Sequence, residues 1–239
     1  MPPLFRRRVV ILPTLWGCLV ALGLLVAALT WAGRSVGAWL AVSEPAAGAN
    51  GGPATLLVVE GWLPEGELDD AVNYARLHGY RRLVTSGGPI QSFSAYSSYA
   101  ERAAQHIGNR LPGVVVHAVP APATAQDRTF ASAIWVRDWA QQNAVPIESI
   151  DVYSLGAHAR RTRALYRLAF GEATQVGIIA GMPRDSDVER WWTTSESSKD
   201  VLMEIVGLAW MQCCFWPAPR GSHDERWGAP RPKRPASAP

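Results

Sequence analysis

Basic side chains cluster in residues 154–163, which read Ser-Leu-Gly-Ala-His-Ala-Arg-Arg-Thr-Arg. An apolar run typical of a buried strand precedes this segment, and an amphipathic pattern that ends at Gly171 follows it. We therefore predict a strand-to-helix turn, with His158, Arg160 and Arg161 at the start of the helix.

Positive charge at that place is unusual. A helix N-terminus itself carries partial positive charge and disfavours each added cation by about 0.3–1 kcal/mol. Free backbone N–H groups and clustered guanidinium groups together favour an anion, most simply a phosphate. The alternative is a solvated basic face without a ligand. We favour the anion site, because ligands of open α/β sheets bind at the carboxyl ends of strands, where this turn is expected.

Polar side chains also follow the other apolar runs that are predicted to be strands. In chain order these turns hold Glu60 and Trp62; Thr85, Ser86, Gly87 and Gly88; Thr124, Asp127, Arg128 and Thr129; and Arg184, Asp185 and Asp187. Parallel topology places the carboxyl ends of all strands at one edge of the sheet, so we expect the turns to lie close together.

The residues of these turns suit distinct roles at a phosphate. Glu60 and His158 are candidate proton carriers. Asp127 is a third candidate catalytic residue, although a helix cap explains it equally well. Arginines would clamp the anion, and a glycine backbone can approach it closely because glycine has no Cβ. The predicted binding residues are Trp62, Ser86, Gly87, Gly88, Arg128, Thr129, Arg160 and Arg161.

Several motifs that would identify other chemistry are missing from the sequence. Neither G-x-G-x-x-G nor G-x-x-x-x-G-K-[ST] occurs, so neither nucleotide-binding fingerprint is present. The G-x-S-x-G elbow of serine hydrolases does not occur either. Histidines and carboxylates do not have metal-ligand spacing. We therefore predict no cofactor and no tightly bound metal, and a nucleotide-cofactor protein remains only a third possibility.

Strand-like and helix-like segments alternate along residues 55–215. Strands are expected at 55–60, 82–86, 113–119, 149–155 and 174–180, and helices at 67–78, 96–111, 125–142, the segment ending at Gly171, and 188–215. This alternation predicts an α/β fold: a Rossmann-like three-layer α/β/α sandwich with a mainly parallel five-stranded sheet, preceded by one N-terminal transmembrane helix.

The N-terminal region has the pattern of a membrane anchor. Arg6, Arg7 and Arg8 precede residues 9–33, 25 residues without a charge, and about 20 apolar residues suffice to span a bilayer. The run is longer than a signal-peptide core, so we expect an uncleaved, single-pass signal anchor. The three arginines predict a cytoplasmic N-terminus and a C-terminal domain outside the plasma membrane. The predicted organisation is residues 1–34 N-terminus and anchor, 35–54 linker, 55–217 α/β domain, and 218–239 a disordered Pro/Arg-rich tail.

Charge is unevenly distributed along the chain. Residues 55–217 carry 14 basic and 17 acidic residues, so the excess positive charge lies in the flanks. A nucleic-acid-binding domain should itself be basic, so we do not expect nucleic acid to be a partner of this chain.

The three cysteines do not form a disulfide framework. Cys18 lies in the apolar run, and the Cα atoms of the neighbouring Cys213 and Cys214 are too close for an unstrained bridge.

Taken together, five segments resemble the successive motifs of the YdcF/SanA/ElyC-like domain family. The segments are residues 59–64 (VEGWLP), 85–89 (TSGGP), 96–101 (YSSYAE), 127–133 (DRTFASA) and 156–163 (GAHARRTR). The resemblance covers about residues 55–180. Many family members have Thr-x-Glu-Asn where this chain has Thr-Phe-Ala-Ser at 129–132, so one expected carboxylate is absent here.

The resemblance implies a bacterial envelope protein behind one membrane anchor, linked to barrier function or to cell-wall and lipid-carrier metabolism. Combined with the basic turn, it predicts a domain that binds a phosphorylated envelope metabolite, such as a polyprenyl phosphate or a cell-wall precursor, and that hydrolyses or transfers at the phosphate. The alternative is a non-catalytic binding or scaffold protein that uses the same anion pocket.

Overall fold

The computed structural model describes residues 14–46, 54–90, 94–124 and 127–227. Its centre is a five-stranded parallel sheet with the strand order β3-β2-β1-β4-β5. The strands are β1 (Leu56–Glu60), β2 (Arg82–Gly87), β3 (Val115–Pro120), β4 (Ser149–Leu155) and β5 (Gln175–Gly181). The predicted α/β fold and parallel sheet are thereby confirmed. The chain order reverses between β1 and β4, which is where open α/β sheets bind their ligands.

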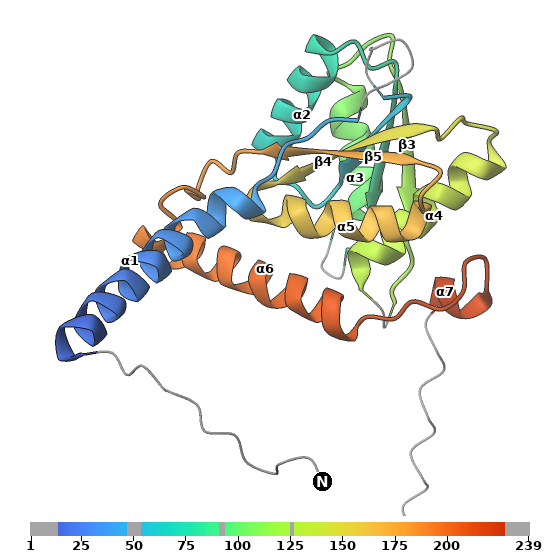
Figure 1. Cartoon of the computed structure of the whole chain (residues 1–239). Helices are drawn as coiled ribbons and strands as arrows, with labels where there is room; N and C mark the ends of the chain where they lie inside the picture. The colour runs from blue at the N-terminus through green and yellow to red at the C-terminus, as the bar shows by residue number, and fades with distance from the viewer. Residues whose placement is uncertain (1–13, 47–53, 91–93, 125–126, 228–239) are drawn as a thin grey trace, which may run out of the picture.

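Helices cover both faces of the sheet (Figure 1). The helices α2 (Glu65–Leu77) and α3 (Tyr99–Gly108) pack on one face, and α4 (Arg128–Gln142) and α5 (Ala159–Phe170) pack on the other. Successive strand residues alternate between the two cores: Leu56 and Val58 face α4 and α5, whereas Leu57 and Val59 face α2 and α3. Both faces of the sheet are buried at its centre, which explains the unbroken apolar run Leu56–Val59 of β1.

An apolar helix, α1 (Leu15–Leu40), precedes the domain, and it is long and apolar enough to cross a membrane. Its last turns belong to the folded domain, because Gly37 and Leu40 are buried there. The predicted linker at 35–54 is therefore wrong over its first residues. Glu44 then forms an antiparallel bridge with Ile178 of β5. Residues 47–53 of that linker lie outside the described residues.

The C-terminal region is also more ordered than its composition suggested. A short helix, α7 (His223–Trp227), packs against α4. Glu225 of α7 is 1% exposed and accepts two hydrogen bonds from Arg137, at 2.8 and 3.0 Å. The predicted disordered tail at 218–239 is therefore wrong for residues 218–227, because Glu225 of the tail joins Asp138 in neutralising a buried arginine on α4. Residues 228–239 lie outside the described residues.

The last long helix, α6 (Ser195–Cys214), begins seven residues after its predicted start, where Thr194 caps it. A single 3-10 turn, η3 (Trp191–Thr193), precedes it. The adjacent Cys213 and Cys214 near its end form a disulfide, contrary to the expectation from their spacing. Capping also moves two other helix starts: α3 begins after Ser98 and α4 after Asp127, each of which accepts a hydrogen bond from the first turn.

Candidate functional site

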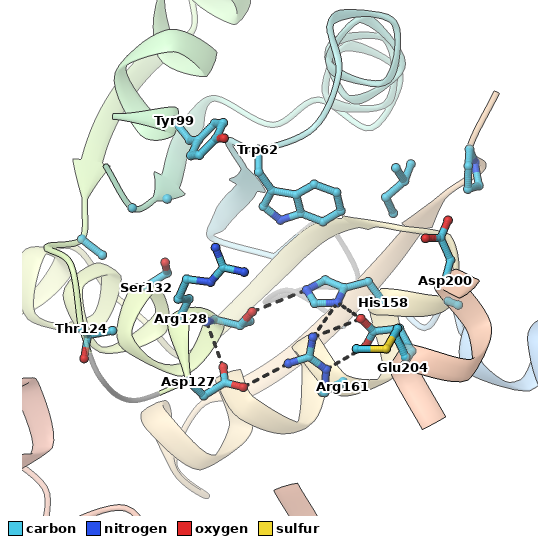
Figure 2. Close-up of a pocket in the computed structure, with 18 of the residues that line it drawn as sticks. Trp62, Tyr99, Thr124, Asp127, Arg128, Ser132, His158, Arg161, Asp200 and Glu204 are labelled. Carbon is cyan, nitrogen blue, oxygen red and sulfur yellow. Dashed lines mark hydrogen bonds and ion pairs between the residues drawn. The ribbon is translucent and has the colours of Figure 1, made fainter. Parts of the chain in front are cut away.

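A cavity of about 800 Å³ opens at the carboxyl edge of the sheet (Figure 2). The loops after β1, β2, β3, β4 and β5 all reach it, as parallel topology requires, and α6 closes one side. The lining includes Trp62, Gly87, Gly88, Tyr99, Thr124, Asp127, Arg128, Thr129, Ser132, His158, Arg161, Asp200, Met203 and Glu204. The structure thus brings most of the predicted turns together in one cavity.

The floor of the cavity is an ion network centred on Glu204 of α6. The Nδ1 atom of His158 lies 2.8 Å from Glu204 Oε1, and Arg161 donates from Nε to Glu204 Oε2 at 2.7 Å. Arg161 also donates from Nη1 to Asp127 Oδ2 at 3.1 Å. Figure 2 shows these contacts as one connected row. Each of the four side chains is at most 15% exposed, so the network is largely shielded from water.

Glu60 lies behind His158 and does not line the cavity. Its carboxylate accepts a hydrogen bond from Ser154 Oγ at 2.5 Å and contacts Thr162 Oγ1 at 3.4 Å. The Nε2 atom of His158 is 3.6 Å from Glu60 Oε1. Glu60 was predicted to be a proton carrier in the turn after β1. In the structure it is still the last residue of β1, paired with Ser86 of β2, so it contacts His158 rather than the cavity.

His158 is flanked by carboxylates on both ring nitrogens. Burial by itself lowers the pKa of His158, but the negative charges of Glu60 and Glu204 outweigh burial and raise the pKa to about 9. Glu204 responds in the opposite direction: burial raises its pKa, but His158 and Arg161 lower it to about 2. At neutral pH the raised pKa favours the imidazolium form, which can donate a proton, and the nearby guanidinium of Arg161, whose Nη2 atom lies 3.1 Å from Nδ1, opposes it.

Asp127 serves both the network and α4. Its Oδ1 atom accepts hydrogen bonds from the backbone N–H groups of Thr129 at 2.9 Å and Phe130 at 3.0 Å. The start of α4 is thus capped by its own carboxylate. This capping role was the alternative explanation of Asp127, and the two N–H groups that it engages are not free to bind an anion. The side chain of Thr129 instead lies 3.5 Å from His158 Nε2.

Arg128 differs from Arg161 in that its guanidinium forms no ion pair with the described residues. Within the described ranges, no hydrogen bond or ion pair joins its guanidinium to another residue, and the side chain is exposed. Figure 2 shows the guanidinium directed into the cavity, toward the rings of Trp62 and Tyr99. The Trp62 ring also contacts His158 edge-on, with centroids 5.4 Å apart. The cavity therefore combines an available positive charge with an aromatic wall.

Two predicted binding residues point elsewhere. Arg160 donates from Nε to the carbonyl oxygen of Trp39 at 2.7 Å and stacks over the Trp39 ring at 4.0 Å, so it holds α1 rather than a ligand. Consecutive helix residues are about 100° apart, which separates the direction of Arg160 from that of Arg161.

Ser86 is buried, and its Oγ atom lies 3.1 Å from the hydroxyl oxygen of Tyr166. Of the predicted Ser-Gly-Gly cradle, only Gly87 and Gly88 line the cavity.

Sequence reasoning missed the contribution of α6. Glu204 interrupts the apolar stretch of α6 that runs from Val201 to Met211, and that interruption was a signal of a functional position in the sequence. Asp200 and Met203 reach the cavity from the same helix.

Within the described ranges, no group of three or more His, Cys, Asp or Glu side chains is arranged to hold a metal ion. Comparisons with family models, curated proteins and solved structures find no match to this chain.

Proposed function

We propose that this chain is a membrane-anchored envelope protein whose cavity binds a phosphorylated lipid or cell-wall precursor. The observation that carries the proposal is the guanidinium of Arg128, which is unpaired within the described part of the chain and directed into the cavity. A charged group without a partner at the mouth of a cavity favours a ligand of opposite charge. The rings of Trp62 and Tyr99 suit an apolar portion of the same ligand.

The charge balance of the cavity limits how the anion is held. The two positive charges of Arg161 and His158 are outnumbered by the three carboxylates that contact them, those of Asp127, Glu204 and Glu60. One arginine, rather than the predicted clamp of three, is therefore left for the phosphate. The affinity should depend strongly on that arginine and on apolar contacts.

The membrane and envelope parts of the proposal rest on other features. The helix α1 is apolar enough to cross a bilayer, and Arg6, Arg7 and Arg8 precede it, which favours an outward-facing domain. The resemblance of the motifs to YdcF/SanA/ElyC-like domains supports a place in the bacterial envelope.

Binding of farnesyl phosphate to the full chain in detergent micelles tests the proposal, with farnesol as the probe that lacks the phosphate. Arg128→Gln should weaken binding of farnesyl phosphate by about ten- to a hundredfold, because a hydrogen bond to a charged group contributes roughly 1.5–3 kcal/mol. The matched control is Arg81→Gln, since Arg81 is also exposed but lies at the opposite end of β2. Equal affinities of the wild type and Arg128→Gln would overturn the proposal.

A second candidate function is hydrolysis or transfer at the bound phosphate. The observation that favours it is the position of His158 on the cavity floor. As the oxygen of water, or of an acceptor hydroxyl, forms a bond to phosphorus and the ester P–O bond breaks, the imidazolium can protonate the leaving oxygen, and Glu60 stabilises the imidazolium before this transfer. Release of phosphate from farnesyl phosphate should then disappear in His158→Gln and decline as the pH rises through about 9. Binding without turnover in the wild type would identify a non-catalytic binding protein.

A further inference from the structure

The outer face of α6 is apolar and exposed. Leu202, Val206 and Trp210, spaced four residues apart on one face of the helix, are 51%, 62% and 44% exposed, and the neighbouring Met203 is 62% exposed. Glu204 is the only charged residue between 201 and 219, and it points inward to His158 and Arg161. Single exposed apolar residues are ordinary, but a continuous row of them marks an interaction surface.

The turn η3, directly before α6, contacts α1 where the uncharged run of α1 ends. The indole Nε1 of Trp191 donates to the carbonyl oxygen of Gly33 at 3.0 Å, and the guanidinium of Arg34 lies 5.5 Å from the centre of the Trp192 ring. Arg34 is the first charge of α1, so a bilayer spanned by the preceding residues would end there. Tryptophan and arginine side chains are typical of that boundary.

The two helices are also packed together. Leu40 of α1 belongs to the same buried cluster as Val201 and Leu208 of α6, which holds α6 at a fixed angle to the anchor. In Figure 1, α1 projects beyond the domain on the same side on which α6 lies, below the sheet. The apolar face of α6 is therefore on the side of the domain that meets the membrane if α1 spans it.

We propose that α6 lies in the membrane–water interface, with Leu202, Val206 and Trp210 in contact with lipid. The inference rests on the proposed anchoring by α1 and adds a second, peripheral contact to it. Helices of this kind bury their apolar face roughly 5–10 Å into the boundary between headgroups and acyl chains. Lipid is the occupant that the structure favours, because the face is continuous with the end of the anchor.

This arrangement places the mouth of the cavity at the lipid surface. Met203 belongs to the exposed face and also lines the cavity together with Glu204. A ligand with a phosphate at Arg128 can then leave its hydrocarbon tail in the bilayer. The substrate class that follows is a phosphorylated amphiphile drawn laterally from the membrane, rather than a soluble phosphate ester.

Spin-label accessibility in the full chain tests the proposal. The chain, with its three cysteines replaced by serine, is reconstituted into vesicles of phosphatidylcholine and phosphatidylglycerol, and one label is attached to Val206→Cys, Leu24→Cys or Leu77→Cys. Leu24 lies in the anchor, and Leu77 is an exposed apolar residue at the end of α2. We expect the ratio of collisions with oxygen to collisions with a nickel chelate to be several-fold higher at 206 and 24 than at 77.

The outcomes separate this inference from the proposed anchoring. A lipid-accessible label at 24 with a water-accessible label at 206 overturns the inference and leaves the anchor intact. A water-accessible label at 24 overturns the anchor and the inference together. A label at 206 that is shielded from both reagents shows that a protein covers the face, which also overturns the inference.

A second measurement uses the wild-type chain and avoids any effect of the cysteine replacements. Met203 and Met182 are similarly exposed, at 62% and 57%, but Met182 follows β5 and lies in a hollow lined by Tyr74 and Leu77 of α2 rather than on α6. In vesicles, water-borne hydroxyl radicals should oxidise Met203 several-fold more slowly than Met182. Equal rates of oxidation would contradict the proposed contact with lipid.

Discussion

Two buried ion networks contact α4, one at its start and one in its second half, and each contains one arginine held by two carboxylates. Arg161 is held by Asp127 and Glu204, and Arg137 is held by Asp138 and Glu225. Burial and ion pairing are common to both networks, so neither property identifies a functional site.

The two networks differ in what adjoins them. The first contains a histidine and forms the floor of an 800 Å³ cavity, whereas the second has no histidine and contributes nothing to that cavity. A titratable group next to open space is what allows a network to exchange protons with a ligand. The network at Arg137 instead joins α7 to the domain, and the following predictions test this division.

The largest effect is expected from Arg137→Met. This change removes the buried cation that pairs with Glu225, which should cost about 3–5 kcal/mol of unfolding free energy. Chemical unfolding of the full chain in detergent measures the loss. The control is Arg226→Met, because the ion pair of Arg226 with Asp138 is more exposed and should cost less than about 1 kcal/mol. Equal effects of the two substitutions would contradict a structural role for the buried pair.

A smaller effect is expected from titration of His158. Its pKa is about 9 in the folded protein and 6.5 unperturbed, so the stabilisation is complete below pH 6.5 and is lost as the pH rises to 9. The loss should be at most about 3 kcal/mol. Unfolding free energies of the wild type and His158→Gln between pH 6.5 and 9 measure it. A slope of the same size in both proteins would show that His158 is not the group responsible.

Glu204→Gln should have the next largest effect. The substitution removes charged hydrogen bonds to His158 and Arg161, which should cost roughly 1.5–3 kcal/mol. It should also lower the pKa of His158, because one of the two carboxylates that raise it is lost. Histidine NMR signals followed against pH measure that second effect. An unchanged pKa of His158 would mean that Glu60 alone maintains the imidazolium.

The smallest effect is expected from Arg160→Gln. Arg160 holds the carbonyl group and ring of Trp39 and does not line the cavity, so its loss should cost about 1 kcal/mol without weakening ligand binding. Arg167→Gln, an exposed change on the same helix, is the control for stability. A large loss of farnesyl phosphate binding in Arg160→Gln would instead support the predicted arginine clamp, in which Arg160 contacts the phosphate.

Much of the fold follows from local patterns. Continuous apolar runs predicted all five strands, because both faces of a parallel sheet are buried. The uncharged run after Arg8 predicted α1, and the polar turns predicted the edge at which the cavity lies. The helix starts at Ser98 and Asp127 were displaced by a few residues, because cap geometry depends on backbone angles that composition does not specify.

The division of roles between residues could not be predicted in the same way. Arg160 and Arg161 are chemically identical neighbours. Because α1 and α6 pack on different sides of α5, Arg160 contacts Trp39 and Arg161 contacts Glu204. Glu204 and Glu225 are likewise far along the chain from His158 and Arg137, which they neutralise.

Local sequence patterns are sufficient for strands, helices and the order of the turns, because these depend on the periodicity and chemistry of neighbouring residues. Charge pairing depends on residues far apart in the chain, and burial makes each pairing strong enough to shift a pKa or order a helix. The tertiary structure therefore decided that His158 is an imidazolium, that residues 223–227 are helical, and that Arg128 is the arginine directed into the cavity.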